Sequence, residues 1–455
     1  MNNKNTHIIL ILFIAVVALV LITIGFSYAL FTYDVSGKIE NQLKTGKYIP
    51  PTLQSVPSNY SDKLWSKKDS ITKVIFQNKL SDIENVAESY DVSEQANNGV
   101  IALLVANADD TSTYTAYIQA DGNIYANENS AYLFSQFDKL QTIEGLEYFD
   151  TSNATTMESM FGDCSSLTNL DLRTFNTSNV TNMIWMFAGC KSLASVDVSS
   201  FDTSNVTNMG FLFDTCINLK ELDLSNFNTS KVDNMSMMFT DNNNLEKLNI
   251  SNFDTSNVTN MFQMFNGCNK LTSIDVSKFI TSKVTTMEGM FRGCTALISI
   301  DLSSFNTSQV TNFSWMFASC RAFTSLNVSM LNTSKATNLA HMFDSCTGLK
   351  ELNLSNFDTS AVTSMELMFC NSNNLETINI SSFNTSNVTS MESMFYNCSS
   401  LVTLDFRNAE FQTVTSYNNM LSNVPSTASI IVKNDTSKEF IGSLINCNIT
   451  IAPTA

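Results

Sequence analysis

Cysteine is the residue type whose spacing in this chain first suggests chemistry. One set recurs at 26 residues or multiples of 26: Cys164, Cys190, Cys216, Cys268, Cys294, Cys320, Cys346 and Cys398. A zinc site needs Cys or His paired at short ligand spacing, and the sequence has no such pair. A disulfide needs Cβ atoms about 3.8 Å apart and facing each other, whereas side chains on stacked strands point the same way about 4.8 Å apart. We therefore expect a ladder of reduced, buried thiols.

Histidine, the usual partner of a catalytic nucleophile, is almost absent. His7 precedes a long apolar run, and His341 stands alone much further along the chain. A Ser–His or Cys–His device needs a histidine beside its nucleophile, so this sequence offers little material for one. We expect His341 to be a variable surface residue rather than a general base.

Carboxylates recur at one position with the same period of 26 residues. The aspartates are Asp171, Asp197, Asp223, Asp275, Asp301 and Asp405, and asparagine fills this column at Asn249, Asn327, Asn353 and Asn379. Because they alternate with apolar residues, they should face outward from a sheet. Two interpretations stay open: a solvated ladder, or a ladder whose mutual repulsion is relieved by a cation. A glycosidase pair would be unique in its chain, so these repeated aspartates predict no enzyme and no cofactor.

The period behind these columns is a 26-residue unit that occurs ten times without insertion or deletion. The copies start at residues 149, 175, 201, 227, 253, 279, 305, 331, 357 and 383. Self-similarity at a fixed period of this length is typical of a solenoid. One copy contains Leu219-x-x-Leu222-x-Leu224, the strand signature of leucine-rich repeats. Each repeat is therefore predicted to contain a strand that is buried on one side, followed by a Thr-Ser corner.

A second part of each repeat carries an apolar cluster of a different spacing. Met183, Met186 and Phe187 stand at i, i+3 and i+4, which predicts one helical turn facing the core. The predicted fold class is α/β, a leucine-rich repeat solenoid with short strands and one helical turn per 26-residue repeat. We expect a small mixed N-terminal domain to cap it, because a terminal rung would otherwise expose its core face.

The domain boundaries follow from where the repeat begins and fades. We predict a signal-anchor or signal peptide at 1–31, a stalk linker at 32–60, an N-terminal capping domain at 61–148, a solenoid of ten full repeats plus one degenerate repeat at 149–421, and a C-terminal cap at 422–455. The stalk rests on three prolines. In the caps we expect strands at 100–105, 114–119 and 430–432, a helix at 438–444, and an incomplete repeat slightly out of phase around Leu140, Ile143 and Leu146.

The N-terminal segment is long and apolar enough to span a bilayer. No charged residue occurs from Ile8 to Tyr33. As an uncleaved anchor, residues 8–31 would hold the chain at the cell surface. As a signal peptide, the segment would be cut after Ala29, since Ser27 and Ala29 are small residues at the positions that signal peptidase recognises, and the chain would be secreted. The net charge of −17 argues against nucleic acid and against adsorption to an anionic membrane surface.

The position between the two methionine columns varies from one repeat to the next and suggests a binding surface. Trp185, Phe211 and Met237 occupy it in consecutive repeats, with Ile184 and Phe262 on the flank. An exposed apolar strip often marks an interaction site. The alternative is that these side chains fold back over a neighbouring turn and only cover the core. The outward-facing aspartate column is the competing candidate for a partner-binding surface.

The full consensus, Leu-x-x-Leu-x-Leu-Ser-x-Phe-Asx-Thr-Ser-x-Val-Thr-x-Met-x-x-Met-Phe-x-x-Cys, resembles the BspA-like leucine-rich repeat surface proteins of bacteria, a repeat also abundant in mycoplasma surface proteins. The resemblance implies a surface-displayed, non-enzymatic protein that adheres to host proteins, other cells or matrix. Its partner would be an extracellular protein or cell-surface ligand. The alternative is a structural envelope or biofilm-matrix component that associates with copies of itself.

Overall fold

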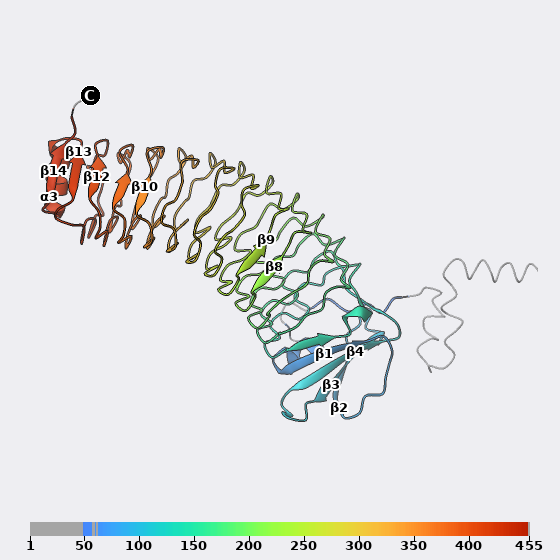
Figure 1. Cartoon of the computed structure of the whole chain (residues 1–455). Coiled ribbons are helices and arrows are strands. Elements are labelled where there is room, and N and C mark those ends of the chain that lie inside the picture. Colours follow the sequence, from blue (N-terminus) through green and yellow to red (C-terminus); the bar gives the residue numbers. More distant parts are fainter. Residues whose placement is uncertain (1–48, 57–59, 61, 454–455) are drawn as a thin grey trace, which may run out of the picture. The chain divides into compact units, whose positions relative to one another are not determined.

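The computed structural model describes residues 49–56, 60 and 62–453 (Figure 1). The predicted anchor at 8–31 lies outside them. Within the described ranges, no helix has both the length and the apolar character needed to cross a membrane. The chain divides into two units, Met1–Pro50 and Pro51–Ala455. The second unit holds all the elements described below.

A mixed five-stranded sheet forms the N-terminal part of this unit, in the order β2-β3-β4-β1-β6. Its elements are the 3-10 helix η2 (Lys63–Ser70) and the strands β1 (Ile71–Gln77), β2 (Val86–Asp91), β3 (Val100–Ala106), β4 (Tyr114–Ala120) and β6 (Thr142–Glu144). β2, β3 and β4 are antiparallel, whereas β1 runs parallel to both β4 and β6. The predicted strands at 100–105 and 114–119 are confirmed.

The predicted stalk is too long at its C-terminal end. Leu53 is only 1% exposed and belongs to the core. Its backbone N–H donates to the carbonyl of Tyr125 at 2.9 Å, and it bridges Ser93. A backbone paired on both sides is part of the folded unit rather than a spacer, so residues 51–56 belong with the capping sheet.

The repeat array begins one rung earlier than the predicted start at residue 149, with a rung that starts at β5 (Ile124–Tyr125). β5 pairs in parallel with β7 (Phe149–Asp150), and the 3-10 helix η3 (Leu146–Tyr148) closes this first rung. The rung is out of phase as expected. Phe134 stacks on Phe161 with ring centroids 5.9 Å apart, an offset of 27 residues instead of 26. This atypical rung connects the capping sheet to the regular repeats.

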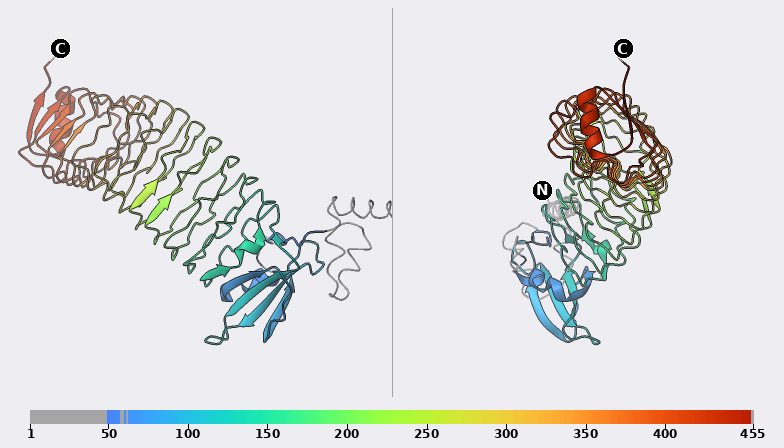
Figure 2. Two further views of the ribbon diagram at one scale, coloured as in Figure 1. Left: turned by 45° about the vertical axis from the view of Figure 1, so that its right-hand side comes forward. Right: turned by 90° about the vertical axis from the view of Figure 1, so that its left-hand side faces the viewer.

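From here the rungs lie side by side along the array (Figure 2), and the arrangement is consistent with a repeat solenoid. Parallel bridges join equivalent residues of successive rungs, from Asn182↔Asn208 to Ser390↔Ser416. Strands are not formed in every rung, contrary to prediction. Within residues 149–421 those after β7 are β8 (Glu221–Asp223), β9 (Lys247–Asn249), β10 (Glu351–Asn353), β11 (Thr377–Asn379) and β12 (Thr403–Phe406).

The prediction of one helical turn per repeat is wrong. The Met-Phe segment of each rung is a run of tight turns, and no helix lies within residues 149–421. In one rung Met186 N donates to Met183 O, three residues back, whereas Trp185 N and Phe187 N donate to carbonyls of the next rung. Alternate N–H groups thus close a turn or reach a neighbour, and no i→i−4 ladder can form.

The core of the array is a stack of aromatic rings beside a ladder of thiols. Rings at the Phe161 position stack along the array, for example Phe187 on Phe213 at 5.2 Å and 6°. Each ladder thiol donates to a phenylalanine carbonyl of the preceding rung, as Cys190 does to Phe161 O at 3.1 Å. Asn242 and Ser372, which fill the two gaps in the cysteine column, donate to the equivalent carbonyls. All ten cysteines are free, as the ladder prediction requires.

The C-terminal cap is formed by two strands and a helix. β13 (Ser429–Val432) and β14 (Asn448–Ile451) extend the sheet of β10, β11 and β12 in parallel. The helix α3 (Asp435–Leu444) lies across the end of the array (Figure 2). Its Phe440 ring packs on Phe411 at 4.8 Å. The predicted strand at 430–432 and helix at 438–444 are confirmed, with the helix starting three residues earlier.

Candidate interaction surfaces

The variable column between the two methionine columns has a backbone that projects its side chains from a tight turn. Trp185, Phe211 and Met237 have φ values of 58°, 58° and 53°, in the left-handed region, and equivalent residues of the other rungs share this conformation. Trp185 is 37% exposed, while Phe211 and Met237 are half-buried. The rings of Trp185 and Phe211 lie 5.3 Å apart at 54°. The structure therefore brings these predicted residues together on one partly exposed strip.

The predicted flanks of this strip are not continuous with each other. Ile184 and Phe262 are both half-buried and occupy one neighbouring column. Gly210 and Ser236 stand between them in the two intervening rungs, so the flank is broken. We define the turn-face strip as Trp185, Phe211 and Met237.

A second cluster on the same column was missed from the sequence. Trp315 and His341 stack with ring centroids 3.5 Å apart at 10°, and the Arg292 guanidinium lies 4.3 Å from the Trp315 ring. His341 Nδ1 lies 3.0 Å from a carboxylate oxygen of Asp344. His341 is thus a half-buried, paired residue, different from the variable surface residue that was expected. Two ring residues in consecutive rungs of this column were the sequence signal.

The aspartates of the strand face are exposed but already engaged in their own turns. Asp223 accepts a hydrogen bond from the backbone N–H of Ser225 at 2.9 Å, and the equivalent bond recurs along the column. The side chain of Arg173 holds the pKa of Asp171 at about 2. In the part of the chain that the structure describes, no group of three or more His, Cys, Asp or Glu residues could hold a metal ion. The column lies at the C-terminal ends of β8, β9, β10 and β11. One oxygen of each of these aspartates is engaged in its own turn.

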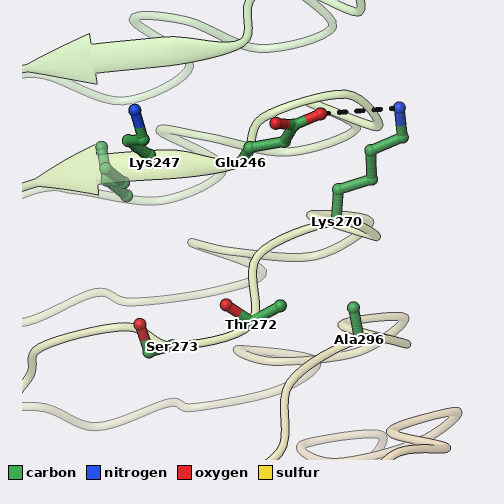
Figure 3. A pocket seen from close by; sticks show the side chains of 7 residues that line it. Glu246, Lys247, Lys270, Thr272, Ser273 and Ala296 are labelled. Carbon is green, nitrogen blue, oxygen red and sulfur yellow. Dashed lines mark ion pairs between the residues drawn. The ribbon is translucent and has the colours of Figure 1, made fainter.

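A hollow of about 650 Å³ opens on the strand face where the paired strands give out (Figure 3). Lys247 on β9 forms an ion pair with Glu221 on β8 at 2.6 Å. On the next rungs Thr272, Ser273 and Ala296 leave space beside them. The Lys270 ammonium lies 3.9 Å from Glu246 on the rim. Because the rim charges pair with each other, this hollow offers a ligand no unopposed charge.

A second hollow, of about 460 Å³, lies on the turn face at the N-terminal end of the array. Tyr132 and Trp185 line it from the same left-handed column, with Ser159 between them. Asp163 and Asp214 contribute carboxylates. Burial raises the pKa of Asp214 to about 6, against the opposing hydrogen bond from Thr215. The column that carries the turn-face strip thus also supplies an aromatic wall of a polar hollow.

The stacked rungs with a Leu-x-x-Leu-x-Leu core column define a leucine-rich repeat protein. The chain belongs to the family described as "Mycoplasma protein of unknown function, DUF285", which matches residues 128–246, 212–329 and 316–434. The first of these matches begins inside the atypical first rung. No curated protein matches the chain.

Two solved structures are similar to parts of this one. A leucine-rich repeat protein from Eubacterium ventriosum ATCC 27560 has 14% identity and a TM-score of 0.39, with 74% of this chain and 95% of that chain covered. A leucine rich cell surface protein from Faecalibacterium prausnitzii A2-165 has 15% identity and a TM-score of 0.26, with 78% and 93% covered.

Proposed function

We propose that this chain is a surface-displayed, non-enzymatic binding protein of the BspA-like type. It would use a repeat solenoid to adhere to host proteins, other cells or matrix, without a cofactor. Residues 8–31 would hold it in the membrane; cleavage after Ala29 with secretion is the alternative. N-terminal sequencing of the protein recovered from a membrane fraction would separate these two modes.

The turn-face strip is the observation that carries this proposal. Three large apolar side chains stand on consecutive rungs of a column whose backbone leaves them partly exposed. Aromatic side chains in the centre of an interface supply much of its binding free energy. The aspartate column remains the competing surface, but its carboxylates accept hydrogen bonds from their own turns.

The test replaces the strip and scores adhesion separately from folding. We expect Trp185→Ser with Phe211→Ser to abolish binding of the chain to immobilised extracellular-matrix extract while its circular dichroism spectrum is kept. Leu367→Ser is a matched control, because Leu367 is a half-buried apolar residue of the same column with φ of 51°. Unchanged adhesion of the double variant would end the proposal. A loss of stability much greater than that of the control would mean that the strip serves mainly to cover the core.

Self-association is the alternative function, and the outer edge of β14 favours it. Among the residues that the structure describes, β14 is the last strand of its sheet, and Ile451 is exposed on it. An unpaired edge strand can pair with another chain. Sedimentation velocity over a hundredfold range of concentration would reveal a polymer if this alternative holds, and a constant monomer if the adhesion proposal holds.

A further inference from the structure

The hollow of about 460 Å³ on the turn face has two aromatic walls separated by a small residue. Tyr132 and Trp185 are two rungs apart in the left-handed column, and Ser159 occupies the rung between them. Rungs spaced at roughly 4.8 Å place the two backbones about 10 Å apart. The volume lies within the usual range of small-molecule sites, about 300–1,000 Å³.

Both walls are held in place by neighbours outside the hollow. The Tyr132 hydroxyl donates to the Glu158 carboxylate, which also accepts from the Asn182 side-chain amide at 3.0 Å. This hydrogen bond raises the pKa of Tyr132 to about 12, so its phenol stays neutral. The Trp185 ring packs against Phe211 on the next rung. A fixed wall loses little conformational entropy when a ligand binds.

The floor consists of small residues, and a side chain on either of two glycines would displace the polar side chain beside it. A Cβ on Gly162 would lie 2.1 Å from Ser159 Oγ. Gly189 has φ of 73°, and a Cβ on it would lie 2.3 Å from an Asp163 oxygen. The hydroxyls of Ser135 and Ser159 lie 3.2 Å apart beneath the walls. The floor thus offers hydroxyl groups at the base of a space that larger side chains would close.

The rim adds groups that accept hydrogen bonds. Asp163, Asp214 and Gln136 line the hollow together with the hydroxyl of Thr215. Lys191 is the single cationic side chain among its lining residues. Carboxylates and amides accept hydrogen bonds from ligand hydroxyls, and bonds to a charged acceptor are the stronger ones. Because the two carboxylates outnumber the one ammonium group, the hollow disfavours binding of an anionic ligand.

We propose that the hollow between Tyr132 and Trp185 binds a neutral saccharide unit of a glycan. The apolar C–H face of the sugar ring would lie against an aromatic wall, and its hydroxyls would donate to Asp163 and Asp214. Uronic and sialic acids would be repelled by these carboxylates. The hollow shares Trp185 with the turn-face strip but is not lined by Phe211 or Met237. The inference goes beyond the proposed adhesion to protein, because it assigns a different ligand to a different set of residues.

The experiment measures binding of the full chain to an array of glycans with neutral, uronate or sialate termini. We expect binding to neutral termini only. Trp185→Ala should abolish it, and Asp163→Asn should weaken it about tenfold or more, as expected for the loss of a hydrogen bond to a charged acceptor. Asparagine already occupies the Asp163 column at Asn371 and Asn397, so this variant should fold.

Asp241→Asn is the matched control. Asp241 shares the column of Asp163 and faces Gly267 as Asp163 faces Gly189, but it does not line the hollow. No binding to neutral glycans, a preference for acidic termini, or equal affinities of the two Asp→Asn variants would overturn the proposal. Competition by a quaternary ammonium compound but not by free hexoses would also overturn it, because it would identify an aromatic cation site instead. Met237→Ser separates the two proposals, since it should weaken protein adhesion while glycan binding is kept.

Discussion

At the scale of single residues, each ladder cysteine is buried and donates its S–H group to a backbone carbonyl inside the core. Burial raises the pKa of Cys190, Cys294 and Cys346 to about 12. Since the thiolate is the nucleophile, a thiol with such a pKa has a reactive fraction on the order of 10⁻⁴ at pH 8. Each of these thiols also donates to a phenylalanine carbonyl of the preceding rung. Both effects make the ladder chemically inert while the rungs stay stacked.

We expect maleimide at pH 8 to label only Cys447, which is half-buried, in the native protein. The buried ladder cysteines and Cys370 should be labelled once the chain is unfolded in guanidinium chloride. Peptide mass spectrometry locates the label, and Cys447→Ser should abolish native labelling. Native labelling of a ladder cysteine, or a disulfide-linked pair of rung peptides, would contradict this prediction.

The sequence predicted these thiols better than it predicted their partners. One cysteine per repeat with no second ligand nearby was enough to exclude zinc and to predict free thiols. That each thiol reaches a carbonyl of the rung before it depends on the turn that carries Phe161, which the sequence pattern misidentified. The exposed state of Trp185 was likewise left open, because its left-handed φ follows from the same turn.

At the scale of elements, buried threonine hydroxyls fasten each corner to the next. Thr281 is fully buried, and its hydroxyl donates to Asn306 O at 3.0 Å and accepts from Asn306 N at 2.8 Å. Equivalent pairs recur along the array, as between Thr203 and Asn228. One side chain thereby satisfies a backbone donor and an acceptor that no strand pairs at this corner.

We expect Thr281→Val to lower the free energy of unfolding by about 1–3 kcal/mol. Valine keeps the shape of threonine in this buried position, but it removes the hydroxyl that pairs with the part-buried backbone N–H and carbonyl of Asn306. Thr281→Ser keeps the hydroxyl and should cost less. Urea denaturation followed by circular dichroism measures both changes. Equal losses for the two variants would show that the methyl group contributes as much as the hydroxyl, and a smaller loss for Thr281→Val than for Thr281→Ser would contradict the role given to the hydroxyl.

The helical turn shows why the periodicity of the sequence was not sufficient. Met183, Met186 and Phe187 do face the core together, as spacing at i, i+3 and i+4 requires. That spacing reports which side chains are buried, but it does not report which N–H bonds to which carbonyl. Here alternate N–H groups pair with the next rung. Only the stacking of rungs, a long-range property, decides between a helix and successive turns.

Strand formation was also decided by side chains that the repeat consensus does not fix. Strands form where the residue before the central apolar position is Glu221, Lys247, Glu351, Thr377 or Thr403. They are missing where it is Ser195, Ser273 or Ser299. Cross-strand pairs of opposite charge, such as Lys247 with Glu221, and threonine pairs stabilise a ladder, and these serines supply neither. The consensus predicted the core column correctly and the hydrogen bonding only in part.

At the scale of the whole molecule, the bonds between rungs reach only nearest neighbours. The threonine–backbone hydrogen bonds join residues that are 25 positions apart in the sequence. The thiol–carbonyl bonds join residues 29 positions apart, and the β-bridges join residues 26 positions apart. In such an array, stability is close to a sum of rung terms and neighbour terms. Removing one complete rung therefore removes the stability contribution of that rung and of one rung–rung interface. Each remaining rung still packs against an equivalent neighbour.

We expect deletion of residues 253–278, one full repeat, to leave a folded protein with a cooperative thermal transition. Deletion of residues 253–265 should instead place core columns opposite surface columns and abolish the transition. Circular dichroism melting of the two variants beside the intact chain measures this. If both deletions were tolerated equally, the chain would not be built from interchangeable rungs.

The left-handed column sets the spacing of its side chains along the surface. Its φ values lie between 50° and 62° from Ser159 to Ser393, so the residue at this position adopts nearly the same backbone conformation in every rung. The column therefore offers one substitutable position per rung at a regular spacing. Exchanging the residues at this position in two adjacent rungs would move a chosen side chain by roughly 4.8 Å along the surface. The spacing between two anchoring side chains can therefore be changed in steps of one rung.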